Sequence, residues 1–300
     1  MFDNAKTRGI LVYLFIAFGG AWVLWITALL AGVPATDPLF QYVALPGGFA
    51  PAVAAVVTRK WVTHEGFADA GLKLRLRRGW PYYLFAWLLP LVVVAIIVAL
   101  AAVLRVDRPD FTLQRALGEL APGANPPSFP SSGLLVSLLV VGVLIQAVVL
   151  TPILWGEEFG WRGYLQVRLL AERPLLAAVV TSLIWGMWHY PIILAGYERY
   201  ESTLLGLLIF PVLTVLLSII FGWLRLRTGS VWCASLAHAS TNAVGGSLTA
   251  LLFLGGSRMT LVGYGGVLAW VPLGALCLWI IFSGQLEPYN ASHNDRAHSV

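Results

Sequence analysis

Residues 132–163 read SGLLVSLLVVGVLIQAVVLTPILWGEEFGWRG, an apolar run that ends in a cluster of charges. No charged residue occurs between Ser132 and Trp155, and the carboxylates of Glu157 and Glu158 follow after a single glycine. Placing a carboxylate beside hydrocarbon costs about 2.5–3.5 kcal/mol on insertion scales. A chain that places two of them there is expected to use them for chemistry or for ion handling.

The spacing within this charge cluster predicts how its members divide. On a helix, Glu158 and Arg162 stand at i and i+4 and can form an ion pair, whereas Glu157 points about 100° away around the axis. We therefore expect the arginine to hold one carboxylate while the other stays free. For Glu157 taken alone, the alternative is a solvated helix end at the cytoplasmic surface.

The composition identifies the class of protein. Of 300 residues, 59% are hydrophobic and 11% are charged, and the mean hydropathy is +0.81, whereas soluble domains carry about 25% charged residues. The chain is therefore expected to be an all-α, polytopic integral membrane protein with the lipid bilayer as its surroundings. Its net charge of +5 does not indicate nucleic-acid binding, because the basic residues are spread between apolar segments.

About eight apolar segments are candidates to cross a bilayer, which takes about 20 residues of helix. They are residues 10–32, 40–58, 80–104, 132–155, 174–194, 203–224, 231–254 and 261–283. The sequence has 19 Lys and Arg residues. If the amino terminus is cytoplasmic, only five of them lie in segments on the outer side of the membrane, namely Arg105, Arg108, Arg115, Arg199 and Arg258. This bias predicts that both termini are cytoplasmic.

Prolines are expected to shape three of these segments. Pro46 and Pro51 should kink or break the second segment, and Pro191 should end or kink the fifth. Pro152 should kink the fourth segment just before the charge cluster. The polar tail from Gln285 is expected to be disordered.

Ionisable and amide side chains within the predicted spans are concentrated on three of them. Besides the charge cluster, those singled out are Gln146, His189 in the fifth span, and His238 with Asn242 in the seventh. Trp185 and His189 share a helix face at the i,i+4 spacing, and so do His238 and Asn242. We expect Gln146 to bond a neighbouring helix and assign it no part in catalysis.

A free carboxylate, two histidines and an amide from three helices suit hydrolysis by an activated water. A glutamate and a histidine would orient and deprotonate the water, and a second histidine with an asparagine would donate hydrogen bonds to the developing oxyanion. Depth is the open point, because His189 lies about 22 Å into its span at 1.5 Å per residue. Either that span begins later than Pro174, or the glutamate pair lies inside the bilayer.

Three motifs occur in order on separate predicted helices. They are E-E-x-x-x-R from Glu157 to Arg162, an aromatic-x-x-x-His from Trp185 to His189, and H-x-x-x-N from His238 to Asn242. Together they resemble the motifs of the CAAX prenyl protease 2 type of intramembrane protease, also called the CPBP or Abi family. The second motif of that family usually reads F-x-x-x-H, so the tryptophan predicts a change in cavity shape rather than in chemistry.

The resemblance implies a role for each matched residue. Glu157 and His189 would activate the water, His238 and Asn242 would form the oxyanion site, and Glu158, Arg162 and Trp185 would support the cavity. It also implies three parts of the chain: residues 1–131 with the first spans and an outer loop, residues 132–255 with the protease core, and residues 256–300 with the last span and the tail.

The function implied by the resemblance is an intramembrane endopeptidase that acts on a membrane-bound peptide or protein, with a CAAX-type substrate as one candidate. A metal-free glutamate mechanism is favoured, and a Zn²⁺ site made by Glu157, His189 and His238 is the alternative. Two other functions are open. One is a proton- or cation-coupled transporter, since buried Glu and His also serve proton relays, although no inverted repeat is evident and polar residues do not continue to the outer face. The other is a non-catalytic peptide-immunity scaffold.

Overall fold

The computed structural model describes residues 4–120, 131–254 and 258–286, and within these ranges the chain forms helices and turns with no β-strand. The helices are α1 (Asn4–Leu30), α2 (Pro38–Gly48), α3 (Ala50–Val57), α4 (Leu76–Leu104), α5 (Gln114–Leu120), α6 (Ser132–Gly160), α7 (Gln166–Arg168), α8 (Pro174–Trp188), α9 (Tyr190–Leu194), α10 (Thr203–Thr228), α11 (Val231–Ser240), α12 (Ser247–Phe253), α13 (Met259–Val262) and α14 (Val267–Phe282). Short π-helical segments follow three of them: η1 (Thr58–Val62), η2 (Trp161–Leu165) and η3 (Thr241–Gly246). The all-α, polytopic membrane fold is confirmed.

Helical structure covers each of the eight predicted spans. Within the described ranges, five helical segments are long and apolar enough to cross a membrane, namely Ala5–Leu30, Leu76–Leu104, Ser132–Arg168, Thr203–Thr228 and Met259–Phe282. The remaining predicted spans are divided, as α2 with α3, α8 with α9, and α11 with η3 and α12. The count of eight crossings stays a prediction. The tail beyond residue 286 lies outside the described residues.

Helices divide at two of the three places where prolines were expected to act. The second span divides at Phe49 between Pro46 and Pro51, and the fifth divides at His189, just before Pro191. Pro152 lies within α6, which continues to Gly160, and the kink expected there stays a prediction. The helix therefore carries the glutamate pair in its last turn rather than in a separate segment.

Serine side chains begin three of the helices that carry or surround the polar motifs. The hydroxyl of Ser131 accepts a hydrogen bond from the backbone N–H of Leu134 at 3.1 Å, and Ser202 and Ser230 do the same at the starts of α10 and α11. Such caps satisfy backbone donors that the first turn of a helix leaves unpaired. The starts of α6, α10 and α11 are thereby fixed by local sequence.

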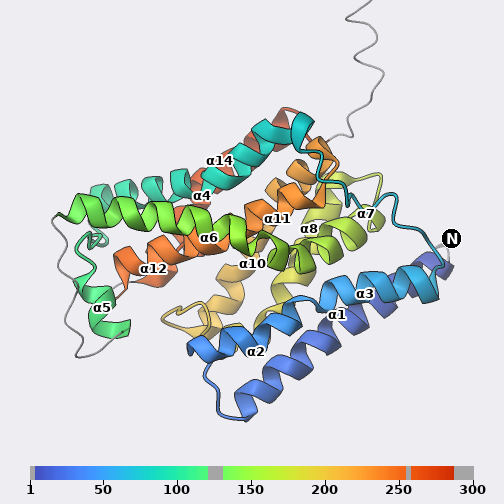
Figure 1. Cartoon of the computed structure of the whole chain (residues 1–300), viewed down its shortest axis with the longest axis horizontal. Helices are drawn as coiled ribbons and strands as arrows, with labels where there is room; N and C mark the ends of the chain where they lie inside the picture. The colour runs from blue at the N-terminus through green and yellow to red at the C-terminus, as the bar shows by residue number, and fades with distance from the viewer. Residues whose placement is uncertain (1–3, 121–130, 255–257, 287–300) are drawn as a thin grey trace, which may run out of the picture.

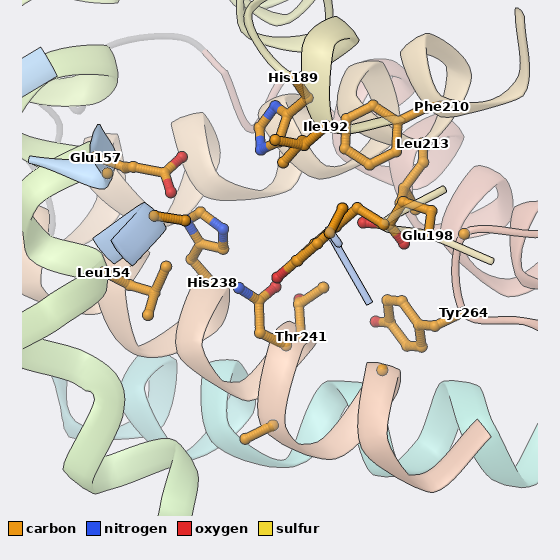
Figure 2. A pocket seen from close by; sticks show the side chains of 18 of the residues that line it. Leu154, Glu157, His189, Ile192, Glu198, Phe210, Leu213, His238, Thr241 and Tyr264 are labelled. Atoms are coloured by element: carbon orange, nitrogen blue, oxygen red, sulfur yellow. The ribbon is translucent and has the colours of Figure 1, made fainter. Parts of the chain in front are cut away.

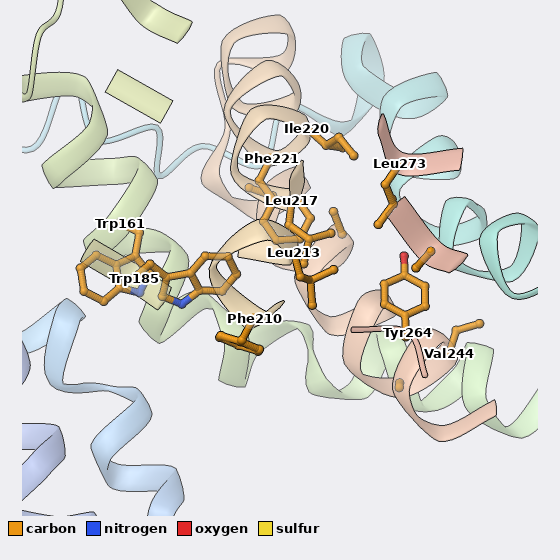
Figure 3. Packing of buried hydrophobic residues seen from close by; sticks show 14 of the residues in the cluster. Trp161, Trp185, Phe210, Leu213, Leu217, Ile220, Phe221, Val244, Tyr264 and Leu273 are labelled. Carbon is orange, nitrogen blue, oxygen red and sulfur yellow. The ribbon is translucent and has the colours of Figure 1, made fainter. Parts of the chain in front are cut away.

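The long helix α6 lies across the middle of the molecule (Figure 1). It packs against α11 and α3, while α10 packs against α8, α11 and α14. The helices that carry the three motifs are thus α6, α8 with its continuation α9, and α11 with its continuation η3. Of these, α8, α9 and α11 pack against α10. The buried side chains Phe210, Leu213, Leu217 and Phe221 of α10 extend from Trp185 toward Tyr264 (Figure 3).

The end of α6 approaches α3 closely because glycines occupy the contact. A methyl group built at Gly160 would lie 2.6 Å from the backbone carbonyl carbon of Pro51, and one at Gly156 would lie 2.8 Å from the ring of Phe49. Small residues at helix crossings allow such approach in membrane proteins. The contact holds the last turn of α6 against the amino-terminal helices.

Replacing Gly160 with alanine should therefore destabilise the protein by about 1–3 kcal/mol, the usual cost of overpacking. Gly142 is the matched control, since it lies in the same helix and a methyl group there meets no atom within 4 Å. Gly142→Ala should leave stability unchanged or slightly raised. The measurement is the free energy of unfolding in detergent micelles by denaturant titration, and equal stability of the two variants would contradict the close contact.

Candidate active site

The ion pair predicted at the end of α6 is present. The guanidinium Nη1 of Arg162 donates to Oε1 of Glu158 at 2.8 Å, and both side chains are fully buried. The arginine also lies over two aromatic rings, with its Cζ 4.5 Å from the ring centre of Trp185 and 5.2 Å from that of Phe221. Contacts of this kind stabilise a cation that has lost its water.

Glu158 has a second partner that the sequence did not indicate. Nδ1 of His238, on α11, lies 3.0 Å from the same Oε1 that Arg162 contacts. An ionised carboxylate only accepts hydrogen bonds, so Nδ1 of the ring is the donor. The remaining ring nitrogen, Nε2, is left for the cavity.

Glu157 is held differently from its neighbour. Its Oε2 accepts a hydrogen bond from the indole Nε1 of Trp185 at 2.9 Å, so the side chain is not entirely free as expected. It is 9% exposed, and it lines a cavity rather than the outer surface. The alternative of a solvated helix end is therefore wrong, because α3 and the residues around Trp185 cover this turn of α6.

Trp185 thus contributes more than bulk to its motif. A phenylalanine at this position, which the related motif usually carries, has no N–H to donate to Glu157. The expectation that the tryptophan alters only the shape of the cavity is incomplete. The donated hydrogen bond fixes the orientation of one carboxylate oxygen and leaves the other, Oε1, available.

His189 sits at the break between α8 and α9. Its Nδ1 lies 2.9 Å from the backbone carbonyl oxygen of Trp185, which can only accept, so Nδ1 carries the proton and Nε2 is unprotonated in the neutral ring. The rings of Trp188 and Phe210 lie with centres 4.8 and 4.9 Å from that of His189. The ring is therefore fixed in direction by both a hydrogen bond and packing.

These side chains open onto one cavity of about 770 Å³. Glu157, His189, His238 and Asn242 all line it, whereas Glu158 and Arg162 lie behind its wall. Figure 2 shows Glu157, His189 and His238 on the same side of this space. Two explanations were open for how His189 could reach the glutamate pair. The helix α8 begins at Pro174, so the span does not begin later than expected. The glutamates are instead buried within the protein, where His189 can share a cavity with Glu157.

Asn242 reaches the cavity from a π-helical segment. The α-helical part of the seventh span ends at Ser240, and η3 begins at Thr241. A second π-helical segment, η2, follows the glutamate pair directly. Single π-turns within helices are often found at functional sites. Here η2 follows the glutamate pair and η3 contains Asn242.

Two cavity residues were missed or misjudged from the sequence. Gln146 is exposed and lines the cavity, and it makes no hydrogen bond to the part of the chain that the structure describes, contrary to the expected bond with a neighbouring helix. Glu198 lines the same cavity from the connection between α9 and α10. It lies in a loop without periodicity, so no sequence signal distinguished it.

The zinc alternative needs three ligands directed at one point. Among the described residues, no group of three or more His, Cys, Asp or Glu side chains is placed to hold a metal ion. One nitrogen of His238 is also directed at Glu158. The geometry gives no support to a site made by Glu157, His189 and His238.

The comparison with known families covers the same part of the chain. Residues 132–244 match the family model described as type II CAAX prenyl endopeptidase Rce1-like. The match begins with the first residue of α6 and ends two residues after Asn242, so it includes all three motifs. Among curated proteins, none matches the chain.

Proposed function

We infer that this chain is an intramembrane endopeptidase, because its residues 132–244 belong to the type II CAAX prenyl endopeptidase family. The observation that carries the proposal beyond the family is the convergence of Glu157, His189, His238 and Asn242 on one cavity. In the reaction that we propose, a water molecule bound in this cavity attacks the carbonyl carbon of a peptide bond.

Glu157 and His189 would activate the water. The oxygen Oε1 of Glu157 is free to accept a proton because Trp185 binds the other oxygen. Nε2 of His189 is an acceptor because Nδ1 is bound to a carbonyl. The carboxylate would take one proton as the water attacks and then pass it to the departing amine, as a general base that becomes a general acid.

His238 and Asn242 would stabilise the oxyanion that forms on the carbonyl oxygen. Asn242 can donate from its amide. His238 already donates from Nδ1 to Glu158, so it can donate from Nε2 as well only in its doubly protonated form. Fixed donors of this kind, directed at the developing charge, supply a large part of catalysis in many hydrolases.

The substrate would be a peptide segment at or within the membrane. The cavity walls are largely aromatic and apolar, formed by Trp25, Trp188, Phe40, Phe210 and Leu213, which suits a hydrophobic segment. A CAAX-type substrate remains a candidate from the family alone. Eight crossings, cytoplasmic termini and the division into residues 1–131, 132–255 and 256–300 belong to the same proposal.

A transporter remains the second candidate because of one observation. The cavity that contains Glu157 also contains Glu198 and Thr36, which lie in connections that the positive-inside reading assigns to the outer side. The argument that polar residues do not continue to that side is therefore weakened. Proteolysis by purified protein, measured against ion uptake in liposomes that contain it, separates the two functions.

Glu157→Ala and His189→Ala should each abolish hydrolysis of a quenched fluorescent peptide library, because each removes a group that activates the water. The loss expected for a general base is at least about 100-fold in kcat. The control is Glu119→Ala, which removes an exposed carboxylate that does not line the cavity and should leave the rate unchanged. Full activity in both active-site variants, at normal expression, would contradict the assignment. The metal content of the same sample and its response to chelators decide between the metal-free and zinc mechanisms.

Trp185→Phe should lower kcat by about tenfold with little change in KM, the effect of losing one hydrogen bond to a charged group, because the indole donor orients Glu157. Trp87→Phe is the matched control, since its indole also donates a hydrogen bond, to the backbone oxygen of Leu144 at 2.9 Å, and the residue does not line the cavity. A Trp185→Phe enzyme as fast as the parent would show that the donated bond does not matter to the reaction.

A further inference from the structure

Glu198 is a cavity carboxylate that the proposed reaction does not use. It lies in the connection between α9 and α10 and lines the same cavity as Glu157 and His189. Figure 2 shows it across the cavity from Glu157, near Leu213 and Tyr264. Of the described residues, Glu157 and Glu198 are the acidic ones that line this space.

Glu198 differs from the other buried or half-buried carboxylates in having no protein partner. The others are bound as follows: Glu65 to Arg168, Asp107 to Arg115, Asp110 to Thr112, Glu157 to Trp185 and Glu158 to Arg162. For Glu198, neither a hydrogen bond nor an ion pair to the described part of the chain is found. Loss of water around it raises its pKa to about 7, because no nearby cation offsets that loss.

The next residue in the chain does not neutralise Glu198. Arg199 also lines the cavity, but its side chain is exposed and no ion pair joins it to Glu198 in the described structure. The backbone at Arg199 has a φ of +54° and that at Gly196 a φ of +86°. The chain therefore turns sharply on both sides of Glu198.

The loop is anchored just beyond this turn. Tyr200 is 9% exposed, and its hydroxyl donates to the backbone oxygen of Gly265 at 3.3 Å. Glu201 accepts a hydrogen bond from the backbone N–H of Thr260 at 3.1 Å. A methyl group at Gly206 would lie 2.6 Å from the ring of Tyr200, so α10 is also fitted to the anchor. The position of Glu198 in the cavity wall is consequently fixed.

We propose that Glu198 binds a positively charged nitrogen of the peptide substrate and so determines which peptides the enzyme accepts. A lysine or arginine side chain, or the amino terminus of the peptide, would supply that nitrogen. A carboxylate deprived of water is stabilised by a cation that donates hydrogen bonds to it. Arg199 also lines the cavity, but it forms no ion pair with Glu198 in the described structure, so the carboxylate is left for a cation of the substrate. The proposal rests on the proposed function, because it assigns the cavity to a peptide.

Binding of short labelled peptides to the full-length protein in detergent tests this assignment. One set consists of acetylated peptides of alanine and leucine in which a single lysine occupies each position in turn. For every such peptide, a neutral control peptide carries norleucine in place of the lysine. Another set leaves the amino terminus free. Wild-type protein should bind one lysine position, or the free terminus, about tenfold more tightly than the neutral partner, as expected for a hydrogen-bonded ion pair. Which set shows the preference identifies the source of the cation.

Glu198→Gln should remove this preference while binding the neutral peptides as the parent does. Glu201→Gln is the matched control, because it lies in the same loop, does not line the cavity and keeps an oxygen for Thr260. It should keep the preference. The assignment is overturned if wild type shows no preference in any set, or if the preference survives in Glu198→Gln.

Hydrolysis measured on the same preparations separates this inference from the proposed function. Charge-dependent binding that needs Glu198, in a protein that cuts no peptide, would support the binding site and contradict the endopeptidase. Cleavage of peptides without any effect of charge would support the endopeptidase and overturn the role of Glu198.

Discussion

One oxygen of Glu158 joins two helices that are distant in the sequence. It accepts from Arg162 on the helix that follows α6 and from His238 on α11, and all three side chains are buried. Removing one member of such a group leaves an uncompensated charge, which costs far more than the pair contributes. This carboxylate therefore fixes the position of α6 relative to α11. Because Glu157 on α6 and His238 on α11 both line the cavity, the same contact fixes the distance between these two cavity residues.

The two adjacent glutamates have different surroundings because neighbours on a helix point about 100° apart. Glu158 faces inward to Arg162, and Glu157 faces the cavity. A second buried arginine, Arg59, contacts the segment η2 that follows the glutamates. Arg59 is fully buried and binds both Asp69 at 2.7 Å and the backbone oxygen of Gly163 at 2.9 Å. The loop after α3 is thus tied to the segment that follows the glutamates.

The sequence alone predicts much of this arrangement. The contacts that it does not predict are those made between separate helices or from a loop. Apolar runs locate the helices, and the i,i+4 spacing predicts the pair between Glu158 and Arg162. The contacts of His238 with Glu158 and of Trp185 with Glu157 depend on how separate helices pack, which no local spacing encodes. Glu198 lies in a loop, where neither hydrophobic periodicity nor a motif marks it.

The contact between Glu158 and His238 is the link most directly open to measurement. A double-mutant cycle with Glu158→Gln and His238→Phe, read as free energies of unfolding in detergent, gives its coupling energy. If the carboxylate joins the two helices, the coupling should be at least about 1 kcal/mol, in the range for residues in direct contact. Effects that add to within about 0.5 kcal/mol, as for distant sites, would contradict the account.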